Sequence, residues 1–355
     1  MLLKTFSSIS RTLQCTTTFS FRSFLPARRL KSQMGVESLS LIRKSKRASF
    51  RLIDVFGFKT DLMEIPSQDT KFHVLFIPGN PGVISFYTDF LESLYELLGG
   101  SASVTGKYTH IYITIGHISH SEKDWGSGRL FSLQEQISHK ISFIEQELGD
   151  VEVPIVLVGH SIGSYISLEI LRRCHEKVIY CIGLYPFLAL NDKSSAQSSI
   201  KKIAALPTIC TVLSFMGGLL GRLPSHISRF LVKISMGKSW SSSSIDVLCT
   251  HVLQYHTIRN MLYMAMTEFQ ELPKTPDLDF IREKKTEIAL LFGHDDHWGP
   301  LHLYQEICTK VPDVSIEVER EGHTHAFSCT EAGSLWAAQH VSSLIKSNIE
   351  TRKNI

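Results

Sequence analysis

The chain has 355 residues, 43% of them apolar and 20% charged, and this composition excludes a disordered or fibrous protein. Its net charge of +3 comes from residues 1–36, which hold six of the 37 bases and no acid, leaving 31 bases against 34 acids in the rest. A nucleic-acid binder concentrates base on its folded body, so we predict no nucleic-acid partner. Seven scattered cysteines without a Cys-x-x-Cys pair argue against a disulfide framework or a zinc site.

The first 36 residues are rich in Ser, Thr and Arg and lack acids, as organelle transit peptides are. We interpret residues 1–36 as a targeting-like or disordered leader. A plastid or a mitochondrion is therefore an alternative location for the protein. If synthesis starts at Met34, the segment is instead an upstream extension, and this alternative stays open.

From Ser49 onward, short apolar runs alternate with helical patterns. The predicted elements are a hairpin near Gly57 (50–56 and 60–65), a strand (72–77), a helix ending near Leu98, a strand (108–114), a helix (132–148), a strand (154–158), a helix (162–174) and a strand (177–184). The alternation resumes with a strand (287–292), a helix (300–310), a strand (313–319) and a helix (331–347). Strands joined by crossover helices predict a mostly parallel sheet with helices on both faces.

Residues 187–280 interrupt this alternation and have a mostly helical pattern. We therefore predict one α/β core, formed by residues 49–186 and 281–348. The segment 187–280 is predicted to be a helical lid inserted into this core.

A nucleophile motif follows the strand at 154–158, which leads directly into Gly159-His160-Ser161-Ile162-Gly163. Between a strand and a helix, Gly-x-Ser-x-Gly places the serine on a strained turn, where its Oγ projects above the sheet. The motif alone is short enough to occur by chance, and a serine at a helix start also acts as a cap. The strand before it and the helix after it favour Ser161 as the nucleophile of an α/β-hydrolase.

A serine nucleophile needs a histidine base, and the histidine needs a carboxylate that fixes its tautomer. In this fold the acid follows a late strand and precedes the histidine along the chain. Asp295 and Asp296 both follow the strand at 287–292. We choose Asp296, because the acid of α/β-hydrolases often stands three residues after such a glycine and four before such a proline. Either aspartate could instead cap the next helix.

Two histidines, His323 and His325, follow the next strand and compete for the role of base. The residues alone leave both open. Together with His294 and His297, they could also suggest a metal cluster. No His-Glu-x-x-His or comparable spacing supports a metal, so we predict neither a metal nor a cofactor.

The oxyanion of an acyl-transfer intermediate needs fixed N–H donors. One donor is expected to be the backbone of Ile162, directly after the nucleophile. The other is expected in the loop Pro78–Gly82, after an early strand. Pro81 has no N–H, so we choose Asn80 as the second donor, although the loop could also be a plain Pro/Gly turn.

These motifs together resemble those of the lipid-droplet-associated hydrolases. The resemblance spans roughly residues 70–345 and rests on Ile77-Pro78-Gly79-Asn80-Pro81-Gly82 with Phe86-Tyr87, Gly-His-Ser-Ile-Gly, Asp296-x-Trp298-x-Pro300 and His325-Ala326-Phe327. It implies Ser161 as nucleophile, Asp296 as acid and His325 as base. It also implies a lipid ester substrate, of sterol ester or acylglycerol type, and a location on lipid droplets and the endoplasmic reticulum membrane surface.

The predicted lid contains an uncharged run, residues 203–221, interrupted by Pro207, Gly217 and Gly218. Its length is close to that of a membrane span, but the breaks favour an interfacial or re-entrant segment. An apolar helical face edged with base follows, formed by Leu223, Ile227, Phe230, Leu231 and Ile234. Such a helix can lie in a membrane surface. It can equally pack on the core as an ordinary lid helix.

The leading functional hypothesis is a serine esterase or lipase that acts at a lipid-droplet or membrane surface, with the lid region in contact with that surface. A soluble organellar esterase or thioesterase is an alternative, in which residues 1–36 act as a transit peptide. A droplet-binding protein with little catalytic activity is another.

Overall fold

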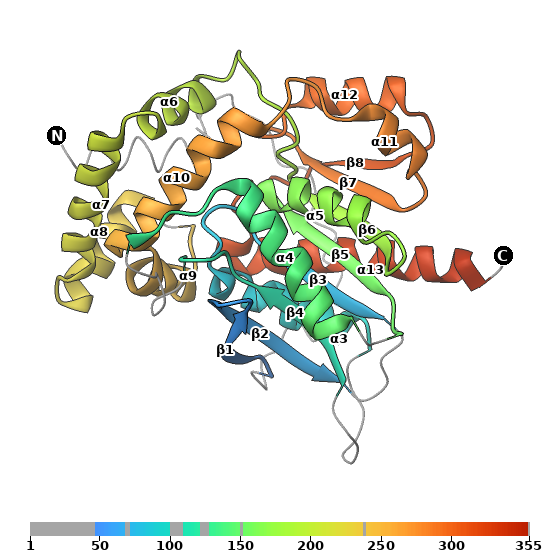
Figure 1. The fold of residues 1–355 in the computed structure, drawn as a ribbon, viewed down its shortest axis with the longest axis horizontal. Coiled ribbons are helices and arrows are strands. Elements are labelled where there is room, and N and C mark those ends of the chain that lie inside the picture. Colours follow the sequence, from blue (N-terminus) through green and yellow to red (C-terminus); the bar gives the residue numbers. More distant parts are fainter. Residues whose placement is uncertain are drawn as a thin grey trace, which may run out of the picture.

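The computed structural model describes residues 47–67, 72–99, 109–120, 128–149, 152–236 and 239–353. The predicted leader, residues 1–36 with Met34, lies outside these residues. The centre of the fold is one eight-stranded sheet in the order β1-β2-β4-β3-β5-β6-β7-β8 (Figure 1). Its strands are β1 (Ser49–Val55), β2 (Phe58–Ser67), β3 (His73–Ile77), β4 (Thr109–Ile115), β5 (Ile155–His160), β6 (Val178–Leu184), β7 (Ile288–Gly293) and β8 (Ser315–Glu319).

The sheet is parallel from β4 through β8, and only the edge formed by β1, β2 and β4 pairs in antiparallel fashion. The central strands β3, β5 and β7 are buried along their whole length. This burial explains why they appear in the sequence as continuous apolar runs instead of alternating patterns. The predicted mostly parallel sheet is confirmed, and the predicted strands match the observed ones to within a few residues.

Helices cover both faces of the sheet and form a separate hydrophobic core on each. One core contains side chains of α4 (Leu133–Leu148), α5 (Ile162–Arg173) and α12 (Leu301–Lys310). The other contains side chains of α3 (Thr88–Leu97) and α13 (Glu331–Lys353), which lie against each other. Figure 1 shows α4 and α5 in front of the strands and α3 and α13 behind them. The fold is therefore that of an α/β-hydrolase, as predicted.

Between β6 and β7 the chain forms a group of helices outside the sheet (Figure 1). They are α6 (Ser195–Ala204), α7 (Pro207–Gly221), α8 (Ser225–Met236), α9 (Ser242–Val247), a π-helical turn (Leu248–Val252), α10 (Tyr255–Glu271) and α11 (Leu278–Glu283). This group, the inserted helices, explains why the strand–helix alternation stops after residue 186. Within the described residues no single helix is long and apolar enough to cross a membrane, but α6 and α7, bent by 94°, would together meet that length and composition.

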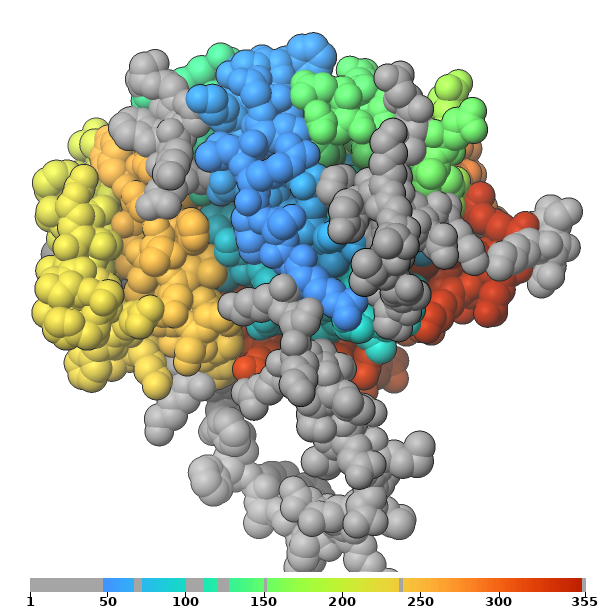
Figure 2. Space-filling view, turned by 90° about the horizontal axis from the view of Figure 1, so that it is seen from below, coloured from blue at the N-terminus to red at the C-terminus, as the bar shows by residue number. Residues whose placement is uncertain are grey.

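Helix α7 is apolar on two sides, and only one side packs against protein. Cys210 and Leu213 are buried against Ile258 and Leu262 of α10. On the other side of α7, and on α8, large apolar side chains are exposed. We call this surface the outer apolar face; it consists of Leu206, Ile209, Val212, Phe215, Leu219, Leu223, Ile227, Phe230 and Ile234. Figure 2 shows the yellow segment that holds α7 and α8 at one edge of the molecule, beyond α10 in orange.

Candidate active site

Ser161 lies on the tight turn between β5 and α5 and has a backbone φ of 56° and ψ of −123°. A positive φ is strained for a residue with a side chain. The two motif glycines make this turn possible by close approach. A Cβ at Gly159 would collide with the Gly163 carbonyl, and a Cβ at Gly163 would collide with the Ile77 carbonyl. The strand, strained turn and helix predicted from the motif are thus present.

The structure brings Asp296 and His325 together from the loops after β7 and β8. The Asp296 Oδ2 accepts a hydrogen bond from His325 Nδ1 at 2.8 Å, and its Oδ1 accepts one from the Trp298 backbone N–H at 2.9 Å. The Asp296 side chain is 1% exposed, so the carboxylate is held by these donors and not by water. Because Nδ1 donates to a carboxylate, a neutral His325 carries its lone pair on Nε2 and can act as a base.

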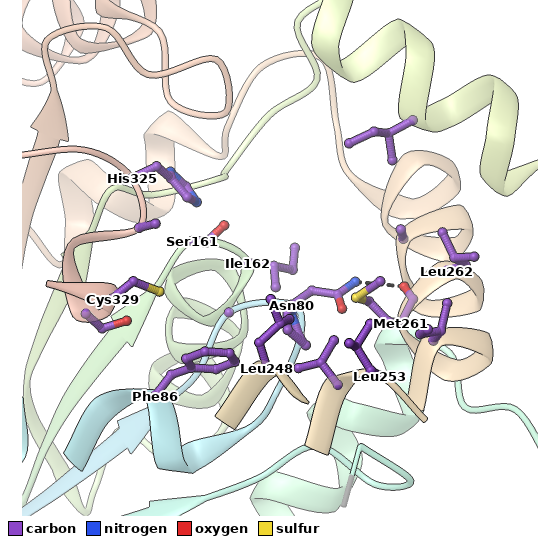
Figure 3. A pocket seen from close by; sticks show the side chains of 18 of the residues that line it. Asn80, Phe86, Ser161, Ile162, Leu248, Leu253, Met261, Leu262, His325 and Cys329 are labelled. Carbon is purple, nitrogen blue, oxygen red and sulfur yellow. Dashed lines mark hydrogen bonds between the residues drawn. The ribbon is translucent and has the colours of Figure 1, made fainter. Parts of the chain in front are cut away.

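The competing residues point elsewhere. Asp295 has a side chain that is 77% exposed, and it pairs with its neighbour His294. The His323 ring packs against Trp336 of α13, with 5.4 Å between ring centroids. His325, in contrast, lines the same pocket as Ser161. Figure 3 shows the Ser161 hydroxyl and the His325 ring on one wall of that pocket. The geometry therefore favours Asp296 and His325 for the roles of acid and base.

The two predicted oxyanion donors lie beside the nucleophile. Ile162 is the first residue of α5, so its N–H has no acceptor within the helix. The loop after β3 packs directly on the nucleophile turn, because a Cβ built on Gly79 would lie 3.2 Å from the Ser161 Cβ. Asn80 follows Gly79 and lines the pocket together with Ser161 and Ile162. The two residues chosen as oxyanion donors therefore line the same pocket as the nucleophile.

A buried hydrogen-bond chain, which sequence reasoning missed, links the loop after β3 to the loop of His325. The Gly79 N–H donates to the Tyr87 hydroxyl at 3.2 Å, and this hydroxyl donates to His160 Nδ1 at 2.8 Å. His160 Nε2 donates to the His325 carbonyl at 2.9 Å. A carbonyl oxygen only accepts, so His160 must be protonated on Nε2.

Burial lowers the pKa of His160 well below 6.5, which keeps the ring in the neutral form that this chain needs. In the motif Gly-x-Ser-x-Gly, His160 is an unspecified position. Tyr87, in contrast, is one of the residues on which the family resemblance rests. Its presence was the one signal in the sequence that could have indicated these hydrogen bonds.

The pocket above Ser161 has a volume of about 400 Å³ and an almost entirely apolar lining. Its walls away from the sheet come from the inserted helices, through Ile203, Met216, Leu220, Leu231, Val232, Leu253, Ile258, Met261 and Leu262. Figure 3 shows Leu253, Met261 and Leu262 across the pocket from Ser161. A pocket of this kind binds an apolar ligand and fixes it with a few polar groups. In the part of the chain that the structure describes, no group of His, Cys, Asp and Glu is arranged to hold a metal ion.

The model of the lipid-droplet associated hydrolase family matches residues 70–328, which is more than half of the chain. Curated proteins named lipid droplet-associated hydrolase are similar to the chain over most of both lengths. The protein of Dictyostelium discoideum is 29% identical over 76% of this chain and 86% of its own length. The Homo sapiens protein is 28% identical over 76% of this chain and 83% of its own length.

Solved structures with the same fold have little sequence in common with the chain. A soluble variant of monoglyceride lipase from Saccharomyces cerevisiae superimposes with a TM-score of 0.56 at 12% identity, over 86% of this chain and 97% of that one. The epoxide hydrolase VrEH1 from Vigna radiata gives a TM-score of 0.57 at 13% identity, over 86% of this chain and 99% of that one. At these identities the likeness shows the α/β-hydrolase fold alone.

Proposed function

Because the chain belongs to the lipid-droplet-associated hydrolase family, we propose that it is a serine esterase or lipase that cleaves lipid esters at a droplet or membrane surface. One observation carries the proposal. The strained Ser161 and His325 line a single apolar pocket, and Asp296 bonds to His325 from behind it. A base, a nucleophile and an apolar binding site are thereby combined in one place.

In the proposed mechanism, Ser161 Oγ attacks the ester carbonyl carbon while His325 Nε2 takes the hydroxyl proton. The carbonyl oxygen becomes an oxyanion, which the backbone N–H groups of Ile162 and Asn80 stabilise. The tetrahedral intermediate collapses, the C–O bond to the alcohol breaks, and His325 returns the proton to the leaving oxygen. Water then attacks the acyl carbon while His325 takes a proton from it. The bond from the acyl carbon to Ser161 Oγ breaks, His325 returns the proton to Oγ, and the acid is released. Asp296 holds the ring and stabilises its protonated form.

We propose a long-chain lipid ester, of sterol ester or acylglycerol type, as the substrate. The apolar lining of the pocket suits a bound acyl chain, and the alcohol part of the ester would then lie outside the pocket. We propose that the inserted helices act as a lid and meet the lipid surface through the outer apolar face of α7 and α8. The large exposed apolar side chains on these two consecutive helices support this contact, since exposed apolar surface of this kind marks interaction sites. Lipid droplets and the endoplasmic reticulum membrane are the surfaces we propose.

The test is hydrolysis of an emulsified long-chain ester by the full chain and by two single variants. His325→Ala is expected to lose ~10⁴-fold in rate, as removal of a catalytic base does. His323→Ala is the matched control two residues away and is expected to keep near wild-type activity. An inactive His323→Ala with an active His325→Ala would refute the assigned base. An inactive wild-type chain that still binds droplets would favour the binding protein over the enzyme.

A further inference from the structure

The apolar pocket contains one carboxyl group, which is unusual for a lining of this kind. Glu268, on α10, is 4% exposed and lines the pocket beside the loop after β3. Burying a carboxyl without partners is unfavourable, so a buried carboxyl is expected to have a hydrogen-bond partner. Neither Ser161 nor His325 bonds to it, and the proposed mechanism does not use it.

The partner of Glu268 is the Asn80 side chain. Asn80 Nδ2 donates to Glu268 Oε1 at 3.0 Å and to the Met261 carbonyl at 3.0 Å. Helical side chains point toward the N-terminus of the helix and carbonyls toward its C-terminus, so Glu268 and Met261, seven residues apart, converge on one point. Figure 3 shows the Asn80 side chain reaching toward α10.

These two bonds decide how the Asn80 amide is oriented. The Met261 carbonyl can only accept, so the Nδ2 group and not Oδ1 must face α10. Oδ1 is buried and has no hydrogen-bond partner among the described residues, so it does not compete for the orientation. The amide is therefore positioned from α10 alone.

The neighbours of Asn80 in the loop are tied to the core of the protein. Gly79 donates to Tyr87, and Gly82 donates to His120 Nδ1 at 2.8 Å. Asn80, in contrast, is tied to α10, one of the inserted helices. Its backbone N–H is the donor that the proposed function assigns to the oxyanion.

We propose that Glu268 is a positioning residue, which holds the Asn80 backbone N–H in place for the oxyanion by anchoring the Asn80 side chain to α10. The proposal rests on the proposed function. It makes α10 serve two purposes, because the same helix lines the acyl pocket through Met261 and Leu262. The inserted helices then set the oxyanion site as well as the binding of the acyl chain.

The ionisation of Glu268 is consistent with this role. Burial raises its pKa to about 8, so the group is mostly neutral at neutral pH. The carbonyl oxygen of a neutral carboxyl still accepts from Asn80. A glutamine at this position would keep that acceptor, and a leucine would keep the approximate volume without it.

The experiment compares Glu268→Gln and Glu268→Leu in the full chain, with a soluble short-chain ester that does not depend on the acyl pocket. We expect Glu268→Gln to keep kcat within about threefold of the wild type. Glu268→Leu should lower kcat by about 10- to 100-fold with little change in KM, below the ~10²–10³-fold loss of a whole oxyanion donor. Glu271→Leu, one turn further along the same helix, is the matched control and should leave kcat unchanged.

A second variant tests the route through Asn80. Asn80→Ala keeps the backbone N–H and removes the side chain, so it should lower kcat about as much as Glu268→Leu. The double variant should lose no more than either single one, because both changes remove the same link. Equal kcat values for Glu268→Leu and the wild type, or additive losses in the double variant, would overturn the proposal. A wild-type chain without Ser161-dependent hydrolysis would instead overturn the proposed function.

Discussion

The outer apolar face offers a direct test of how the chain meets lipid. Phe215, Leu219 and Phe230 on this face have exposed fractions of 55%, 44% and 63%. Full burial of such a side chain stabilises by about 1.5–3 kcal/mol, so the exposed parts of all three together can contribute about 3 kcal/mol at a lipid surface. At 1.4 kcal/mol for each factor of ten, replacing the three by Asp should weaken binding by about 100-fold. The unfavourable transfer of three carboxylates adds to this loss.

The assay is flotation of the full chain with phospholipid-coated triacylglycerol droplets, with the bound fraction measured against droplet concentration. The matched control places Asp at Phe50, Leu52 and Phe56, which are comparably exposed but lie on the β1–β2 hairpin. The control should bind droplets like the wild type. Both triple variants should unfold at the same denaturant concentration as the wild type, because the replaced side chains are exposed. Equal droplet binding by a folded α7–α8 variant would show that this face is not the membrane contact.

Three further predictions concern the pocket and its surroundings. Tyr87→Phe leaves the Gly79 N–H and His160 Nδ1 without their hydrogen-bond partner. The free energy of unfolding in urea should therefore fall by about 1–3 kcal/mol for each group, and an unchanged midpoint would contradict these hydrogen bonds. Leu262→Trp fills the pocket, so kcat/KM should fall for a long-chain ester and not for a short-chain one; equal losses for both would place the acyl chain elsewhere. Burial of Glu268, assisted by Glu271, raises the pKa of this carboxyl from 4.5 to about 8. The contribution of Glu268 to the stability of the folded protein is therefore complete below pH 4.5 and is lost as the pH rises through 8. Glu268→Gln should therefore gain up to about 5 kcal/mol relative to the wild type between pH 4.5 and pH 9, and parallel stability curves would refute the raised pKa.

Much of the fold could be predicted because its central strands are buried on both faces. β3, β5 and β7 are short, mostly apolar runs, and runs of this kind are typical of parallel strands inside a covered sheet. The context of Ser161 could be predicted equally well, since the motif needs only a strand before it and a helix after it. The exposed side of α7 and α8 could not be predicted in the same way. Residues 203–221 are apolar on both sides of α7, and only the packing on α10 decides which side stays exposed.

The polar partners in the site depend on contacts between distant segments. Glu268 lies in an amphipathic helix, where a glutamate normally faces water, and it meets Asn80 188 residues away. His160 bonds to Tyr87 and His325, which lie 73 and 165 residues away. No periodic pattern in the local sequence predicts such pairs. The choice between His323 and His325 was open for the same reason, because two histidines after one strand differ only in where the loop points them.

The most direct test of the account is the covalent labelling of the nucleophile. The full chain would be treated with a fluorophosphonate probe, and its intact mass and digested peptides would be measured. One adduct is expected on the peptide that contains Ser161, and Ser161→Ala should take up none while keeping its fold and losing ester hydrolysis. Labelling at another residue, or a Ser161→Ala variant that hydrolyses esters at the wild-type rate, would contradict the account.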